Sequence, residues 1–93
     1  MIRLHATVQG QVQGVGFRYW AHHTAQRLSG VGGGYVKNLP NGSVEIEAEA
    51  LERAPLQALL VELHRGPAQA QVTAVEAKWE EDVEGRHLSF RVA

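Results

Sequence analysis

The sequence predicts an α+β fold, a two-layer sandwich in which two helices cover one face of a mostly antiparallel sheet. Two periodicities in the 93 residues predict it. Four segments and a shorter terminal one alternate apolar and polar residues, as half-buried strands do. Two other segments repeat their apolar residues at helical spacing. Because each strand has a single apolar face, we expect both helices on one side of the sheet and water on the other.

The first half of the chain contains one strand, one loop and one helix. A strand is expected over residues 1–10, followed by a glycine-rich loop, Gly10–Gly16. Apolar residues every three or four positions predict a helix from about Phe17 to about Leu28. The glycines of Gly30–Gly34 are expected to end this helix and to form a flexible connection.

The second half contains four strands and one helix. In order we expect a strand over Tyr35–Leu39, a tight turn at Pro40–Gly42, a strand over Val44–Glu49, a helix over Pro55–Leu63 stopped by Gly66–Pro67, a strand over Val75–Glu80, a polar turn over Glu81–Arg86 and a short strand over Leu88–Val92. The order is β-α-β-β-α-β plus a terminal strand, the split βαβ pattern of ferredoxin-like domains. The length suits one domain over residues 1–93.

Composition limits the class of protein. The chain has 9 basic and 10 acidic residues and a net charge of -1 at pH 7, which argues against non-specific binding to nucleic acid. It has no cysteine, so disulfides, thiol nucleophiles and thiolate metal sites are excluded. No apolar run approaches the roughly 20 residues that span a bilayer. Residues 1–10 do not have the pattern of a signal peptide. We therefore expect a cytoplasmic monomer without a membrane or nucleic-acid partner.

The acidic residues are unevenly distributed along the chain. Residues 1–40 contain four basic residues and no aspartate or glutamate, and every acidic residue follows from Glu45 onward. Chance explains this asymmetry as well as an anion site in the first half does.

The segment from Gly10 to Arg18 combines three features of an anion-binding loop. The start of a helix presents unpaired N–H groups and partial positive charge. Glycines let neighbouring amides point into one concavity, and the guanidinium of Arg18 matches two phosphate oxygens. A glycine-rich turn followed by a surface arginine explains the same residues equally well. The segment is not a Walker loop, because Gly16, Phe17 and Arg18 stand where that motif requires Gly-Lys-Ser/Thr.

Asn38 is a second candidate, because it ends a strand just before the expected turn. Its side-chain amide both donates and accepts hydrogen bonds, so it can hold a water molecule in one orientation. Taken by itself, an asparagine in this position more often caps the turn through its own backbone.

Together the two segments resemble a known family. The segment Gly10-x-Val12-Gln13-Gly14-Val15-x-Phe17-Arg18 is similar to the first acylphosphatase signature, and Gly34-Tyr35-Val36-Lys37-Asn38-x-x-x-Gly42-x-Val44 to the second. The order of the motifs, the chain length and the expected order of elements also agree with that family. The density of this match favours the anion site over the ordinary turn.

The resemblance implies hydrolysis of small-molecule acyl phosphates to a carboxylate and inorganic phosphate, without a metal or cofactor. Arg18 matches the family's phosphate-binding arginine and Asn38 its water-orienting asparagine. The phosphate oxygens would be shared among the loop residues Gln13, Gly14, Val15, Gly16, Phe17 and Arg18. Inorganic phosphate or other anions would bind as product or inhibitor. Two features depart from the family: Ala50 stands where a glycine is usual, and the connection Ser29–Gly34 is longer than expected.

Domains of this predicted fold also serve two functions of other classes. Ferredoxin-like domains also bind RNA through aromatic residues on the first and third strands, but those strands offer no aromatic side chain here. A non-catalytic or regulatory phosphate-binding module is the stronger alternative.

The remaining histidines and tryptophans have structural explanations. His22 and His23 are adjacent, so on a helix they point about 100° apart and do not share a metal ion. These two, His64 and His87 are expected to be partly exposed, and His5 to be exposed. Trp20 and Trp79 stand at core positions, and packing is expected for both.

Overall fold

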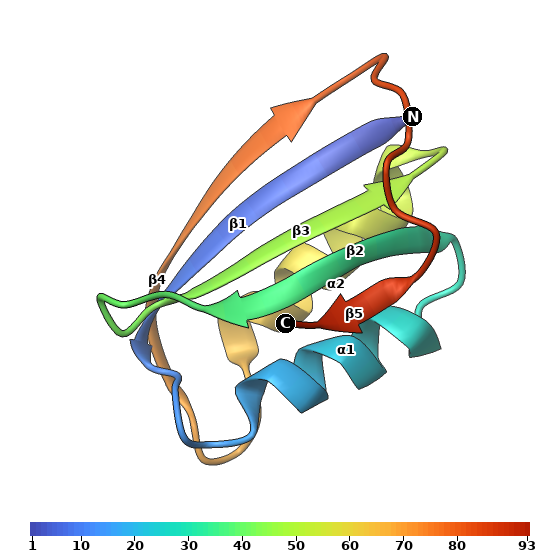
Figure 1. Ribbon diagram of the computed structural model, residues 1–93. Helices are drawn as coiled ribbons and strands as arrows, with labels where there is room; N and C mark the ends of the chain where they lie inside the picture. The colour runs from blue at the N-terminus through green and yellow to red at the C-terminus, as the bar shows by residue number, and fades with distance from the viewer.

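The computed structural model describes all residues, Met1–Ala93, and has the predicted two-layer α+β architecture (Figure 1). Its elements, in chain order, are β1 (Ile2–Gln11), α1 (Phe17–Arg27), β2 (Val31–Asn38), β3 (Val44–Ala50), α2 (Arg53–Arg65), β4 (Gln71–Glu80) and β5 (Phe90–Val92). No helix is long and apolar enough to cross a membrane.

The sheet has the strand order β4-β1-β3-β2-β5. All neighbours are antiparallel except β2 and β5, which are parallel. In the central pair, Leu4 lies opposite Ala48 and Ala6 opposite Ile46, so the apolar residues of both strands face the same side. Both helices cover that side of the sheet (Figure 1).

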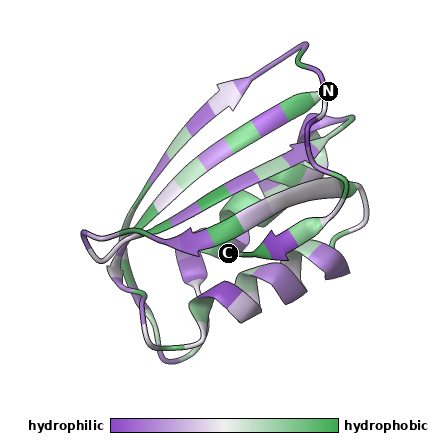
Figure 2. Ribbon diagram, in the orientation of Figure 1, coloured by the Kyte–Doolittle hydropathy of each residue, from purple (hydrophilic) through white to green (hydrophobic).

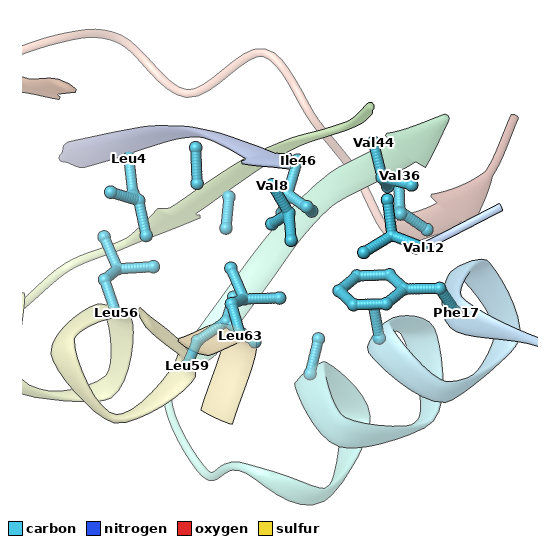
Figure 3. Close-up of a cluster of buried hydrophobic side chains, with 14 of the residues drawn as sticks. Leu4, Val8, Val12, Phe17, Val36, Val44, Ile46, Leu56, Leu59 and Leu63 are labelled. Atoms are coloured by element: carbon cyan, nitrogen blue, oxygen red, sulfur yellow. The ribbon is translucent and has the colours of Figure 1, made fainter. Parts of the chain in front are cut away.

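The core lies between this face and the helices. Figure 2 shows the alternation of hydropathy along the strands that produces the apolar face. Leu56, Leu59 and Leu63 of α2 lie at the spacing of one helical face and are fully buried. Phe17, the first residue of α1, is also buried, and its ring lies beside Val12 (Figure 3). Trp20 and Trp79 pack against the same core, as expected. Phe17 therefore anchors the start of α1, next to the glycine-rich loop.

The expectation of a flexible connection over Gly30–Gly34 is wrong. Val31 begins β2, so only residues 28–30 connect it with α1. The glycines were expected to end the helix and form a loop, but most of them lie within β2, where they permit close backbone packing: a Cβ atom on Gly34 would lie 1.9 Å from the carbonyl oxygen of Glu47 on β3. The long connection inferred from Ser29–Gly34 is thus absent. Ala50, the other departure, is buried in β3 opposite Ile2.

We expected the second face of the sheet to face water over its whole area, but part of this face is covered. The segment 81–89 runs from the end of β4 past the N-terminus to β5 (Figure 1). Under it, Arg3, Glu47 and Glu49 are buried. The fifth strand, which was expected over Leu88–Val92, begins only at Phe90, after this segment. His87 is partly exposed as a whole residue, as predicted, although only 8% of its side chain is accessible. His5 is half-buried and pairs with Glu47 and Glu80.

Two glutamates of β3 hold this segment against the sheet. Glu49 accepts hydrogen bonds from the Arg3 guanidinium at 2.7 and 2.9 Å and from the backbone N–H groups of Arg86 and His87. Glu47 accepts from the Arg86 guanidinium at 2.6 Å and from the His87 ring. Burial by itself raises the pKa of Glu47, but these hydrogen bonds outweigh it and lower the pKa to about 2. Both carboxylates are therefore charged, paired anchors.

Candidate active site

The loop between β1 and α1 forms a cluster of free backbone donors. Gly14 and Gly16 have φ angles of 74° and 77°, in the left-handed region that glycine adopts without strain. Gly16 is the N-cap of α1, and no side chain caps this end of the helix. None of the backbone N–H groups from Gln13 to Arg18 has an acceptor in the protein. Such a loop at a helix N-terminus is suited to an anion.

Gln13 ties this loop to the β2–β3 hairpin. Its side-chain amide donates to the carbonyl oxygens of Leu39 and Ser43, at 2.8 and 2.9 Å. The loop and the hairpin lie at the same end of the molecule (Figure 1). The two sequence motifs, which are separated by α1 along the chain, are thereby joined in space.

Asn38 is the last residue of β2, and its side chain makes no hydrogen bond within the protein. The turn is capped by a different asparagine: the Oδ1 atom of Asn41 accepts from the N–H of Ser43 at 3.1 Å and from its hydroxyl at 2.5 Å. Turn capping therefore does not explain Asn38, and its exposed amide is free to bind something else.

One pocket brings the two motifs together. It has a volume of about 190 Å³ and is lined by Val12, Gly14, Gly16, Phe17, Arg18, Tyr19 and Asn38. Of the residues predicted for the site, Gly14, Gly16, Phe17, Arg18 and Asn38 thus line a common cavity. Gln13 and Val15 do not line it. The side chain of Gln13 is turned toward the hairpin, and that of Val15 packs on the core.

The electrostatics of this pocket favour an anion. No aspartate, glutamate or histidine lines it, and Arg18 is its only charged residue. One guanidinium nitrogen of Arg18, Nη1, donates to the Ala93 carbonyl oxygen at 3.0 Å, which leaves the other donors of the fork available. A larger hollow of about 450 Å³ lies on the opposite face of the sheet, but Glu45, Glu47 and Glu76 line it and would repel a phosphate.

Some features of the pocket were not predicted. The contact between Arg18 and Ala93 depends on the parallel pairing of β5 with β2, for which the sequence contains no local signal. Tyr19 also lines the pocket and was not among the predicted site residues. Its exposure is 68%, and its place in the pocket is known only from the fold. No group of three or more histidine, cysteine, aspartate or glutamate residues is arranged to hold a metal ion.

Comparison with known proteins gives a consistent result. The family model described as Acylphosphatase matches residues 4–92. A relative named "Acylphosphatase" from Thermus thermophilus is 46% identical over 90 residues, covering 95% of this chain and 99% of its own. A crystal structure of acylphosphatase from Bacillus subtilis is 33% identical and superposes with a TM-score of 0.89, covering 100% of this chain and 99% of that one. The structure of an acylphosphatase from Coxiella burnetii, at 42% identity, has a TM-score of 0.83 and covers 98% and 90%.

Proposed function

The chain belongs to the acylphosphatase family, and from that membership we propose how its pocket hydrolyses an acyl phosphate to a carboxylate and inorganic phosphate. The phosphoryl group is held by Arg18 and by the loop residues Gln13 to Phe17, and the attacking water is oriented by Asn38. The observation that carries this proposal is that Arg18, Asn38 and the loop residues Gly14, Gly16 and Phe17 line one pocket, beside loop N–H groups that have no acceptor in the protein.

The loop holds the phosphoryl group in place. Free N–H groups and the partial positive charge of the α1 N-terminus both favour binding of an anion here. The planar fork of Arg18 binds two phosphate oxygens. Phosphoryl transfer depends mainly on positioning and on stabilisation of the charge on the phosphoryl oxygens, which these groups provide.

Asn38 aligns the water with the phosphorus–oxygen bond that breaks. Its amide oxygen accepts a hydrogen bond from the water, while the amide nitrogen remains free to donate. This role is supported by the unbonded side chain at the end of β2 and by the Gln13 tether that holds the hairpin beside the loop. Because the water is already held in line, its translational and rotational freedom is lost before the reaction, and this lowers the barrier.

The proton of the water passes to the substrate. The leaving group is a carboxylate, which is a weak base and needs little help from an acid. No carboxylate or imidazole lines the pocket to act as a base, and a carboxylate there would be repelled by the phosphate. We infer that a phosphoryl oxygen of the substrate takes the proton. The pH dependence of kcat/KM is then set by the substrate, and an essential enzyme group titrating near pH 7 contradicts this step.

We further propose that the protein is a single-domain, cytoplasmic monomer. It acts without a metal or cofactor and has no nucleic-acid or membrane partner. The alternative is a module that binds phosphate without hydrolysing anything. Turnover separates the two functions, because both predict binding of inorganic phosphate.

The test is hydrolysis of acetyl phosphate and benzoyl phosphate in the presence of EDTA. We expect multiple turnovers, and a fall in kcat/KM of about 10²–10³-fold for Arg18→Ala. Arg27→Ala, an exposed arginine in the last turn of the same helix, is the control and retains activity. Absence of turnover excludes the enzyme, and loss of activity on EDTA treatment excludes a metal-independent reaction.

A further inference from the structure

Tyr19 lines the proposed active site but has no part in the chemistry described above. It is the third residue of α1 and directly follows Arg18. It lines the same pocket as Arg18 and Asn38, yet 68% of its surface is exposed. Its hydroxyl makes no hydrogen bond within the protein, unlike that of Tyr35, which donates to Glu45. Neither core packing nor a hydrogen bond explains this aromatic ring.

The position of Tyr19 follows from the orientation of α1. Phe17 points into the core, where 1% of it is accessible. The next two positions of a helix are rotated by about 100° and 200° from it, so Arg18 and Tyr19 lie outside the core. The two side chains point about 100° apart, and both residues line the pocket at the start of the helix.

An acyl phosphate has a second half that must lie in or beside this pocket. Among the residues that line it, Val12 and Phe17 are buried in the core, and the glycines have no side chain. Arg18 and Asn38 are polar and are assigned to the phosphoryl group and the water. Tyr19 alone offers an accessible apolar surface to the acyl group.

We propose that Tyr19 forms the acyl-binding subsite and favours aromatic acyl phosphates over small ones such as acetyl phosphate. This inference rests on the proposed function, because it assumes that the phosphoryl group occupies the loop. The ring packs against the acyl group in an offset or edge-to-face arrangement, as aromatic pairs do. A tyrosine on a helix orders only two side-chain torsions when it does so, so the contact is formed at low entropic cost.

The experiment compares kcat/KM for benzoyl phosphate and acetyl phosphate and uses the ratio of the two. We expect Tyr19→Ala to lower this ratio by roughly 3- to 10-fold, the range of one aromatic contact. Tyr19→Phe retains the ring and keeps the ratio. Val61→Ala is the matched control, because Val61 is a helix residue with a similar exposure, 64%, and does not line the pocket. An unchanged ratio in Tyr19→Ala, or an equal loss in Tyr19→Phe, overturns the proposal.

A binding measurement separates this inference from the proposed function. Benzylphosphonate and methylphosphonate carry an aromatic and a small substituent on phosphorus. Their phosphorus–carbon bond is not hydrolysed, so their affinities can be measured by calorimetry. The proposal predicts tighter binding of benzylphosphonate, a preference that Tyr19→Ala removes. If the protein shows this preference but hydrolyses neither acyl phosphate, the proposed function fails while the subsite stands. If it hydrolyses both substrates and binds both phosphonates equally, the subsite fails alone.

Discussion

The side-chain amide of Gln13 donates a 2.9 Å hydrogen bond to the carbonyl oxygen of Ser43, and so connects the phosphate loop with the hairpin that follows Asn38. A second bond, to the Leu39 carbonyl, reinforces it. Gln13 does not line the pocket, so its side chain acts on the site by holding the two motifs in register. The proposed reaction depends on this register, because the water on Asn38 must face the phosphorus atom.

Gln13→Leu tests the tether. The variant removes two hydrogen bonds with little change in volume, and the two carbonyl oxygens keep their backbone partners, the N–H groups of Gly42 and Leu39. We expect a loss of about 1–2 kcal/mol in the free energy of unfolding and a fall in kcat of about 10-fold from misalignment of the water. Gln9→Leu, an exposed glutamine of β1, is the control. Full activity in Gln13→Leu would show that the hairpin is held without Gln13.

The buried carboxylate of Glu47 predicts a loss of stability in acid. Its pKa is about 2 in the folded protein and 4.5 without the fold. Between these values the unfolded chain binds more protons, so the contribution is complete above about pH 5 and is lost as the pH falls toward 2. The shift corresponds to about 3 kcal/mol. Chemical unfolding followed from pH 7 to pH 2.5 measures it.

Glu47→Gln is expected to be less stable than the unmodified protein at pH 7 and to lose less of its stability in acid. Glu76→Gln removes an exposed carboxylate from the same face of the sheet, and its profile should follow the unmodified one. If the profiles of Glu47→Gln and Glu76→Gln coincide, the pairing of Glu47 with Arg86 and His87 does not stabilise the fold.

Substitution by alanine is expected to have different effects on stability at two glycines of β2. Gly34→Ala places a Cβ atom 1.9 Å from a backbone oxygen of β3, so strands must move apart, at a cost of roughly 2–4 kcal/mol. Gly32→Ala places it 3.5 Å from the Glu49 carbonyl oxygen, an ordinary contact, and the free energy of unfolding should change by less than about 1 kcal/mol. Thermal unfolding of the two variants checks this, and similar melting temperatures would contradict the close approach at Gly34.

These glycines also show what the sequence can and cannot predict. Strand and helix periods predicted the order of elements, because each element buries one face against a common core. The prediction of a flexible connection at Gly32, Gly33 and Gly34 was wrong, because glycines in a loop and glycines that let two strands approach have the same local sequence. The difference lies in the partner strand, which is distant in the chain.

The candidate site divides in the same way. Arg18 and Asn38 stand in dense local motifs and could be selected from the sequence, and they line one pocket. The burial of Glu47 and Glu49 could not be foreseen, because it depends on a segment more than 30 residues away that crosses the sheet. In alternating strands, a polar residue predicts only the face opposite the core, not whether water reaches it.

The division of roles between Arg18 and Asn38 is the central claim, and steady-state kinetics combined with inhibition by inorganic phosphate tests it most directly. We expect Arg18→Ala to weaken both phosphate inhibition and kcat, because it removes a group that binds the phosphoryl oxygens in substrate, transition state and product. Asn38→Ala should lower kcat by about 10²-fold while the inhibition constant of phosphate changes by less than about 2-fold. If Asn38→Ala weakens phosphate inhibition as much as it lowers kcat, then Asn38 binds the phosphoryl group and does not orient the water, and the account is contradicted.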